Sequence, residues 1–295
     1  MHILHIDSGT EMRGGQWQVL RLIEGLRARN HRSVLVARAD APLFAEAKRR
    51  EIEVQPLNFH PLLRGTRVAD ITHVHDARSH TIAAVLAPLR LVVSRRVAFP
   101  VHQNRFSRWK YRQATHYIAI SKSVRQTLLD AGIAFSRITV VYDGVPLQPQ
   151  SQGNDVLIPE SHDPLKGMDL ALAGVKLAGK TARVSNDLEN DLAHAAIFLY
   201  ITHSEGLGSA ALLAMSAGVP VIASKVGGLV EVVRHLQTGL LTENTPEAIA
   251  GALRLLAADP LLAQSLAQNA RAMIQQRFSV DRMVTDTLAV YEAIT

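Results

Sequence analysis

Residues 204–231 read SEGLGSAALLAMSAGVPVIASKVGGLVE. Apolar spacing predicts a helix at Ser209–Ala217, between short buried strands at Ile197–Thr202 and Val219–Ser224. The glycines before the helix let the backbone approach a ligand closely, and the first helical amides form a site suited to a diphosphate. Glu205 stands just before the helix, where its carboxylate can accept hydrogen bonds from sugar hydroxyls. A glycine turn with a solvated acidic cap residue explains the same letters without a ligand.

The same alternation of strands and helices extends over the whole chain. Apolar runs such as His2–Asp7 and Ile71–His75 are continuous, and helical spacings such as Trp17–Leu26 fall between them. This pattern is typical of a parallel sheet covered by helices on both faces. Pro146–Asp155 is rich in Pro, Gln, Ser, Gly and Asn and indicates a linker, after which the pattern restarts. The sequence therefore predicts two α/β halves, with ligands bound at the C-terminal ends of strands.

Length and composition narrow the class of protein. A chain of 295 residues is long enough for two domains, and 47% apolar with 20% charged residues favours buried cores over disorder. No apolar run approaches the roughly 18 to 20 residues that a membrane helix needs, and the N-terminus does not resemble a signal peptide. The lack of cysteine excludes disulfides, thiolate metal sites and cysteine nucleophiles. We therefore expect a cytoplasmic protein.

The charge is unevenly distributed. Residues 1–150 hold 22 Lys and Arg against 11 Asp and Glu, a net of +11, whereas residues 151–295 hold 10 against 15, a net of −5. Most of the basic residues are arginines, which pair with phosphate and carboxylate groups through two hydrogen bonds. The basic half suggests nucleic acid, an anionic membrane face or a phosphorylated substrate, although an Arg-rich composition with solvated faces explains it too. Because no nucleic-acid motif accompanies the charge, we expect no nucleic-acid partner.

Several motifs together resemble the retaining, nucleotide-sugar-dependent glycosyltransferases of the GT-B fold and the family 4 type. The segment from Glu205 is similar to their pattern E-G-[FL]-G-x-x-x-L-E-A-M-A-x-G-x-P-V-[IV]-A, which G-G-x-x-E follows. Further similar segments occur in the family's order: Gly14-Gly15 (a glycine loop), Asp70–Asp76 (D-V-V-H-V-H-D), Ala119–Val124 (A-V-S-x-x-V), Val140–Val145 (V-I-x-N-G-V) and Phe278–Tyr291 (the last helix).

The resemblance implies a GT-B fold, in which two Rossmann-like domains face a central cleft. Residues 1–150 would form the acceptor-binding domain, 151–278 a shortened nucleotide-sugar-binding domain, and 279–295 a crossover helix that packs on the first domain. The implied activity is that of a retaining hexosyltransferase, which needs neither metal nor cofactor beyond its nucleotide-sugar substrate. It would serve cell-surface polysaccharide or glycolipid synthesis, with an anionic or lipid-linked acceptor and peripheral contact with an anionic membrane face at the inner membrane.

The resemblance also implies the site residues. Glu205, His75 and Arg96 would be catalytic; for Arg96, at the end of the strand Leu91–Ser94, a plain basic strand end is as good an interpretation. The donor would be bound by Gly14, Gly15, Lys166, Gly206, Leu207, Gly208 and Ser209.

This chain departs from the family pattern in its second half. Leu213 stands where the family has a second glutamate, which typically holds the nucleotide ribose, and no arginine precedes Lys166 nearby. Leu213 either removes a ribose contact or is simply a core residue. The second half also lacks material that family members have before Glu205. A degenerate protein that binds a sugar or an anionic glycan without efficient transfer is therefore the alternative function.

Thirteen histidines raise the question of a metal site. We expect His73 and His75 to face opposite sides of their strand and therefore not to share an ion. His102, His162 and His203 stand alone in the sequence, and no spacing matches a zinc site. The sequence predicts no metal site.

Overall fold

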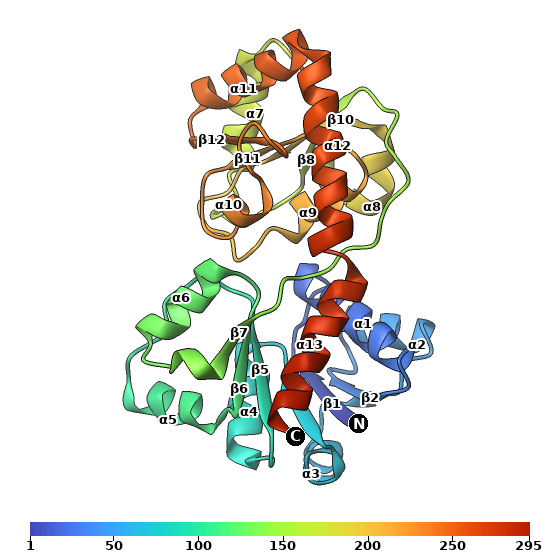
Figure 1. The fold of residues 1–295 in the computed structure, drawn as a ribbon, viewed down its shortest axis with the longest axis vertical. Helices are drawn as coiled ribbons and strands as arrows, with labels where there is room; N and C mark the ends of the chain where they lie inside the picture. The colour runs from blue at the N-terminus through green and yellow to red at the C-terminus, as the bar shows by residue number, and fades with distance from the viewer. The chain divides into compact units, whose positions relative to one another are not determined.

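Two units make up the structure, a computed structural model that describes residues 1–295 (Figure 1). Unit 1 comprises Met1–Gly144 and Val280–Thr295, and unit 2 comprises Val145–Ser279. The chain thus leaves unit 1 once and returns to it with its last helix.

Unit 1 contains a seven-stranded parallel sheet in the order β3-β2-β1-β4-β5-β6-β7. Its strands are β1 (His2–Asp7), β2 (Arg32–Ala37), β3 (Val54–Pro56), β4 (Ile71–Val74), β5 (Leu91–Arg95), β6 (His116–Ala119) and β7 (Ile138–Val140). The central strands are buried almost throughout, which explains their continuous apolar runs. The strand order reverses between β1 and β4, so their C-terminal ends form the topological switch point of this sheet.

Helices cover this sheet. They are α1 (Gly14–Arg27), α2 (Pro42–Arg49), α3 (Phe59–Val68), α4 (Ala77–Leu86), α5 (Arg105–Gln113), α6 (Lys122–Asp130) and α13 (Val280–Ile294), with a 3-10 turn at Phe135–Arg137. The last helix, α13, lies against the sheet beside α1 and buries Met283, Val284 and Tyr291 among apolar residues of the central strands (Figure 1). The end of the chain is therefore part of the core of unit 1.

Two helices of unit 1 have no counterpart in the sequence predictions. The helix α3 contains Pro61 and Gly65, and α5 buries only Tyr111. In α3 these two poor helix formers interrupt the apolar spacing of Phe59, Leu62 and Leu63, and in α5 a single buried residue gives no apolar stripe to recognise. Gly14 and Gly15 also differ from expectation, because they begin α1 instead of lying in a loop.

Unit 2 contains a five-stranded parallel sheet in the order β12-β11-β10-β8-β9. Its strands are β8 (Asp155–Pro159), β9 (Ala182–Ser185), β10 (Ala195–Tyr200), β11 (Val221–Ser224) and β12 (Leu240–Thr242). Its helices are α7 (Met168–Leu177), α8 (Leu188–Asp191), α9 (Ser209–Ser216), α10 (Leu229–Val232), α11 (Pro246–Ala258) and α12 (Pro260–Arg277), with a 3-10 turn at Leu192–His194. Here the order reverses between β8 and β10.

Both units are parallel α/β sheets with helices, and the predicted fold class of two Rossmann-like domains is confirmed. The core of unit 2 joins β8 and β10 to α7, α11 and α12, as Leu199, Ile249 and Leu266 illustrate. No single helix combines the length and the hydropathy needed to cross a membrane; α11 and α12 reach both only as a pair, across a bend of 101°.

Candidate functional site

A cavity of about 140 Å³ lies at the switch point of unit 2. Pro159 at the end of β8 and Tyr200 at the end of β10 line it, together with Lys166 and with Ala210 from the first turn of α9. Open α/β sheets bind ligands at this place, because the helices that follow the two strands diverge to opposite faces. The cavity is therefore the first candidate for a ligand site in unit 2.

Glu205 and Lys166 meet beside this cavity. The Lys166 Nζ lies 2.6 Å from the Glu205 Oε2, and the Tyr200 hydroxyl donates to the same oxygen at 2.5 Å. Lys166 also lies 3.2 Å from the Tyr200 oxygen. Burial, together with the neighbouring carboxylate, raises the pKa of Tyr200 well above its usual value, so the phenol stays a donor. The side chains of Lys166 and Glu205 are 27% and 15% exposed, which leaves this pair within reach of a ligand.

The loop that carries Lys166 is bonded to the end of β10. The amide of Gly167 donates to the Ile201 carbonyl at 3.0 Å, and the amide of His203 donates to the Leu165 carbonyl at 2.8 Å. These backbone bonds hold Lys166 on one side and fix the chain just before Glu205 on the other. The position of the ion pair is thus set by main-chain geometry more than by flexible side chains.

The Gly227-Gly228 pair supports the loop that carries Glu205. The amide of Gly228 donates to the Glu205 carbonyl at 3.0 Å. A Cβ on Gly227 would lie 2.2 Å from the Glu205 carbonyl oxygen, and one on Gly228 would lie 2.1 Å from that of Gly206. Only glycine permits this close approach of two backbones, so the two glycines hold Glu205 in place.

The helix α9 begins at this loop. Its N-cap residue, Gly208, has a left-handed φ of 106°, and no side chain caps the helix. Amides at an uncapped N-terminus carry partial positive charge and attract anions. Leu207 is 1% exposed as a whole residue, whereas Ser209 is partly exposed. Lys166 and this N-terminus together give the cavity a positive side.

Leu213 lies in the most buried part of α9 and is 6% exposed. Every residue from Ala211 to Ser216 is buried. The position favours the core interpretation of Leu213 over a lost contact with a ligand.

We expect Leu213→Glu to lower the stability of unit 2 by several kcal/mol, about 3 or more, because it buries a carboxylate without a partner. The volume-conserving Leu213→Met should cost less than about 1.5 kcal/mol. Thermal melts of both variants test this, together with calorimetric titration of UDP. Tighter UDP binding by Leu213→Glu with an unchanged melting temperature would show instead that this side chain reaches the ribose.

Unit 1 gathers polar side chains at its own switch point. Asp7 ends β1, His75 follows β4, Arg96 follows β5 and Asp143 follows β7. Arg96 forms an ion pair with Asp143, and their side chains are 14% and 5% exposed. The Cδ of Arg96 would lie 3.3 Å from a Cβ on Gly15, so the start of α1 is close to this pair. Burial raises the pKa of Asp7, whose carboxylate accepts from the Gly9 amide at 2.8 Å.

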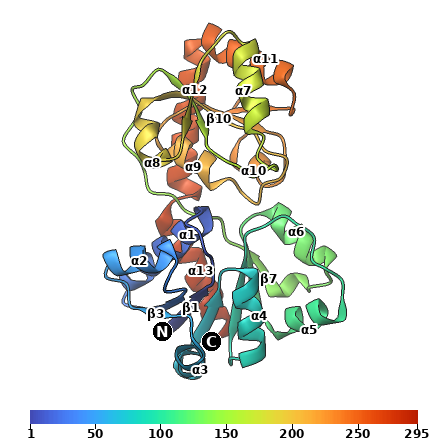
Figure 2. The ribbon, with the colours of Figure 1, turned by 180° about the vertical axis from the view of Figure 1, so that it is seen from behind.

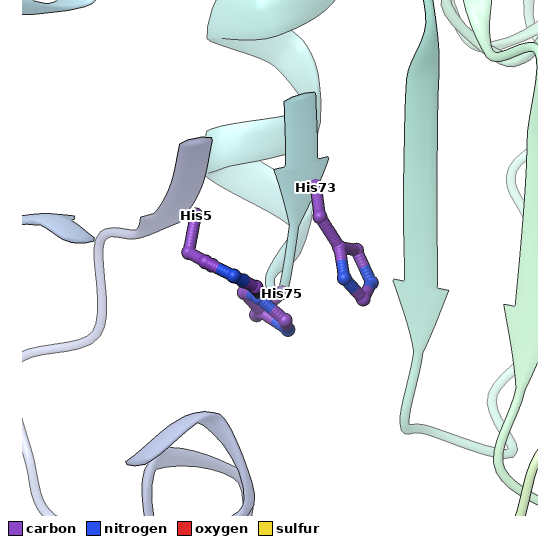
Figure 3. A group of neighbouring side chains, drawn as sticks. All are labelled: His5, His73 and His75. Carbon is purple, nitrogen blue, oxygen red and sulfur yellow. Dashed lines mark hydrogen bonds between the residues drawn. The ribbon is translucent and has the colours of Figure 1, made fainter. Parts of the chain in front are cut away.

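Three buried histidines lie at the same place (Figure 3). The His5 Nδ1 is 3.1 Å from the His75 Nε2, and the His73 and His75 ring centroids are 4.1 Å apart. The expectation that His73 and His75 face opposite sides of the strand is wrong. Successive side chains alternate, so residues two apart share a face. His5 joins them because β1 pairs with β4 in a register that sets His5 opposite His73.

The histidine cluster is neutral at physiological pH. Burial lowers the pKa of His5 to about 3. Burial, then the neighbouring histidines, and last the charge of Arg96 lower the pKa of His73 and of His75 well below the usual value. His73 is fully engaged, with Nδ1 2.6 Å from the Tyr291 hydroxyl and Nε2 2.8 Å from the Ser94 Oγ. The His5 Nε2 and the His75 Nδ1 have no partner.

Neutral imidazoles are metal ligands, and one nitrogen from each ring lies within 4.8 Å of the others. Two observations oppose a cation. Arg96 already acts electrostatically on His73 and His75, and both nitrogens of His73 are engaged in hydrogen bonds. The expectation of no metal site stays a prediction.

The residues predicted from sequence fall into two groups. Glu205, Lys166 and the 206–209 turn come together in unit 2, while Gly14, Gly15, His75 and Arg96 belong to unit 1. Sequence reasoning missed Tyr200, Asp143 and His5. Two of these carried a usable signal, since Tyr200 lies near the end of the predicted strand Ile197–Thr202 and Asp143 lies within a quoted motif.

Models of two protein families match the chain. "Glycosyltransferase Family 4" matches residues 12–149, and "Glycosyl transferases group 1" matches residues 171–273. A D-inositol 3-phosphate glycosyltransferase from Jonesia denitrificans is 42% identical over 92 residues, which are 31% of this chain and 22% of the relative. An N-acetyl-alpha-D-glucosaminyl L-malate synthase from Bacillus anthracis is 32% identical over 102 residues, 34% of this chain and 26% of that protein. The match thus spans about a quarter or less of the curated relatives.

Solved structures resemble the whole chain. Anabaena HepE in complex with UDP and glucose superposes with a TM-score of 0.85 at 19% identity and covers 99% of this chain and 100% of that one. A glycosyltransferase from Rickettsia africae superposes with a TM-score of 0.81 at 18% identity, over 99% of this chain and 98% of that one. At such identities the superpositions establish the fold.

Proposed function

Because the chain belongs to the GT-B glycosyltransferases of the family 4 type, we propose that it transfers a sugar from a nucleotide-diphosphate sugar to an acceptor. One observation carries this proposal: at the switch point of unit 2, Lys166, Glu205 and the uncapped N-terminus of α9 meet beside one cavity. A cation and helix amides suit a diphosphate, and a carboxylate suits sugar hydroxyls. HepE, in complexes with UDP, UDP-glucose, or UDP and glucose, has the same fold.

Each group in unit 2 has a distinct role in the proposed reaction. The amides of the 208–211 turn and the Lys166 amine take the charge that develops on the leaving diphosphate, which no metal ion is needed to neutralise. The Glu205 carboxylate, held by Lys166 and Tyr200, accepts hydrogen bonds from the donor sugar. Ser209, which is partly exposed, lines the approach, while donor contacts of the buried Gly206 and Leu207 stay predictions.

Unit 1 supplies the acceptor side in this proposal. His75 has an unpartnered Nδ1, and Arg96 is paired with Asp143 at the same sheet edge. A neutral imidazole and a guanidinium can hold a hydroxyl acceptor by hydrogen bonds. We propose that the reaction retains the anomeric configuration, with the leaving phosphate accepting the acceptor's proton. The basic charge of unit 1 favours an anionic or lipid-linked acceptor in cell-surface polysaccharide or glycolipid synthesis, and hence peripheral contact with an anionic membrane face.

A panel of UDP-, GDP- and ADP-sugars tests the proposal directly. We expect the purified chain to hydrolyse or transfer at least one of them, with the product anomer read by NMR and the rate unchanged by EDTA. A product of inverted configuration would contradict the proposed retention, and a rate that EDTA abolishes would contradict the proposed independence of metal ions. No turnover of any donor, with nucleotide binding preserved, favours the second candidate.

That second candidate is a protein that binds a sugar or an anionic glycan without efficient transfer. The buried Leu213, in place of the family's second glutamate, favours it, since a leucine cannot hold a ribose. The loss of a hydrogen bond between a carboxylate and a ribose hydroxyl weakens the free energy of binding by about 1.5 to 3 kcal/mol, or about 10- to 150-fold in affinity. Weak nucleotide binding is thus expected under both functions, and turnover separates them.

A further inference from the structure

His5 and His75 form a buried pair at the switch point of unit 1, which Figure 3 shows from the side. The His5 Nδ1 lies 3.1 Å from the His75 Nε2, and the two ring planes differ by only 16°. The residues are 0% and 4% exposed, so bulk solvent does not compete for this contact. The other nitrogen of each ring, Nε2 of His5 and Nδ1 of His75, has no partner. The pair therefore has one internal hydrogen bond and two open ends.

The sheet and its helices fix the position of the pair. His5 lies within β1, between the parallel neighbours β2 and β4. The His75 amide donates to the Ile6 carbonyl at 3.0 Å, which ties the end of β4 to β1. The His73 ring packs on the His75 ring and is itself held at both nitrogens. Figure 2, seen from behind Figure 1, shows α4 on the face of this sheet opposite to α13. The two rings thus have little freedom to separate.

The single hydrogen bond couples the tautomers of the two rings. Both rings are neutral at physiological pH, because burial lowers the pKa of His5 to about 3 and that of His75 well below its usual value. A neutral imidazole carries one N–H, and the hydrogen bond at one nitrogen decides which nitrogen holds the proton. Either His75 Nε2–H donates to His5 and leaves the His75 Nδ1 bare, or His5 Nδ1–H donates to His75, whose own proton is then on Nδ1.

The first of these arrangements is the more stable. It puts the proton on Nε2 in both rings, and the Nε2–H form is the intrinsically preferred tautomer of a neutral histidine side chain. The second arrangement puts both protons on Nδ1. In the first, the bare Nδ1 of His75 is a buried hydrogen-bond acceptor at the C-terminal edge of the sheet, where such sheets bind ligands. A buried acceptor without a partner is costly unless a bound molecule completes it.

We propose that His5 is a positioning residue that keeps His75 in its Nε2–H form, so that the His75 Nδ1 accepts a hydrogen bond from a hydroxyl of the bound acceptor. This inference rests on the proposed function. In that reaction the proton of the attacking hydroxyl passes to the leaving phosphate, so the hydroxyl that His75 holds is a neighbouring one. The acceptor is therefore a polyol, with a second hydroxyl close to the reacting one, and His75 orients it without acting as an acid or a base.

NMR of the imidazole nitrogens measures the tautomer directly. Long-range proton–nitrogen spectra of protein labelled with nitrogen-15 histidine distinguish a protonated from a bare ring nitrogen, and the signals lost in His75→Gln assign that ring. In the parent protein at pH 7.5 we expect His75 to have a protonated Nε2 and a bare Nδ1. A His75 that is charged, or that carries its proton on Nδ1, would overturn the proposal. This measurement needs no substitution of His5, so it decides the matter even if the His5 variants fold poorly.

Two substitutions of His5 separate positioning from packing. Asparagine places an amide oxygen where the His5 Nδ1 lies, so His5→Asn keeps an acceptor for the His75 Nε2–H, whereas His5→Leu removes it. The measurement is the ratio of sugar transferred to a polyol, glycerol or methyl glucoside, against sugar transferred to water. This ratio does not depend on how much of a variant is folded. His5→Leu should lower it about 10-fold, the effect of one lost hydrogen bond, and His5→Asn by no more than about threefold.

His80→Phe is the control, because it changes another buried histidine of unit 1 that packs between Tyr111 and Tyr117 and not against the pair. It should leave the ratio unchanged. A ratio in His5→Leu equal to that of the parent would overturn the proposal. A parent protein with the expected tautomer that turns over no donor would sink the proposed function alone, whereas turnover by a protein whose His75 is protonated on Nδ1 would sink this inference alone.

Discussion

We expect Glu205→Gln to lower the rate of sugar transfer by about 100-fold or more, as for other groups that hold a transition state by charge-assisted hydrogen bonds. The structure gives the physical reason. Lys166 and Tyr200 both point at Oε2, and the Gly206 amide donates to Oε1 at 3.1 Å. Glutamine has one acceptor oxygen where the carboxylate has two. If that oxygen accepts from Lys166 and Tyr200, the NH₂ group faces the Gly206 amide, and if it accepts from the Gly206 amide, the NH₂ group faces Lys166 and Tyr200.

The variant should also lose stability, because Lys166 is left partly buried without its counter-charge. We expect a loss of about 1 to 2 kcal/mol, less than for a fully buried pair since the amine is 27% exposed. Rates must therefore be compared well below the melting temperature of the variant, with folding checked by circular dichroism.

Glu160→Gln is the matched control, since Glu160 lines the same cavity without contacting Lys166. It should change turnover by no more than a few-fold. A KM-against-kcat analysis then separates roles: Lys166→Met should both raise KM for the donor and lower kcat, because the amine meets the charge that develops on the leaving diphosphate, whereas Glu205→Gln should mainly lower kcat. Unchanged turnover in Glu205→Gln would remove Glu205 from the site.

Local patterns were sufficient for most of the fold. Strands such as β1 and β10 lie inside the sheet and must be apolar on both faces, so each appears as a continuous run. The helix α5 escaped prediction because its only buried residue is Tyr111, so its sequence holds no stripe of buried apolar residues.

Without the family resemblance, which supplied Lys166, the site was predictable only where one segment carries it. Glu205 and the glycines before α9 are neighbours in sequence, and Gly227 and Gly228 lie a short distance beyond. The contacts that give Glu205 its environment come from Lys166, 39 positions away, and from Tyr200. The pairing of His5 with His75 depends on strand register across 70 positions, which no local pattern encodes.

The last prediction concerns acid, to which we expect unit 1 to be more sensitive than unit 2. Four histidines of unit 1 are almost fully buried: His5, His73, His75 and His80. Burial lowers the pKa of His5 and of His80 to about 3, with Lys110 adding to the effect at His80. In the unfolded chain each would titrate near 6.5. Below that pH the unfolded state binds more protons, so stability is complete above pH 6.5 and is lost progressively as the pH falls toward 3.

The expected loss is large. Below pH 6.5, each such histidine lowers the free energy of unfolding by up to about 1.4 kcal/mol per pH unit. At pH 5, His5 and His80 alone therefore lower it by about 4 kcal/mol. Ordinary domains have only about 5 to 15 kcal/mol of stability. We therefore expect unit 1 to unfold between about pH 4 and pH 5. Both tryptophans lie in unit 1, so their fluorescence reports this transition, while circular dichroism follows the whole chain.

His80→Phe provides the decisive comparison, because it removes one buried titrating group and keeps an aromatic ring between Tyr111 and Tyr117. The His80 Nε2 has no partner to lose, whereas the ring's hydrogen bond with the Lys110 backbone is lost. We expect the variant to move the fluorescence midpoint to lower pH by about 0.3 to 0.5 units, with a cost at pH 7.5 of no more than about 1 kcal/mol. His162→Gln, in unit 2 with a side chain 89% exposed, should leave the midpoint where it is. An unmoved midpoint in His80→Phe would mean that paired carboxylates such as Glu46, whose pKa the hydrogen bond from Arg49 lowers to about 2, control acid unfolding in place of the histidines.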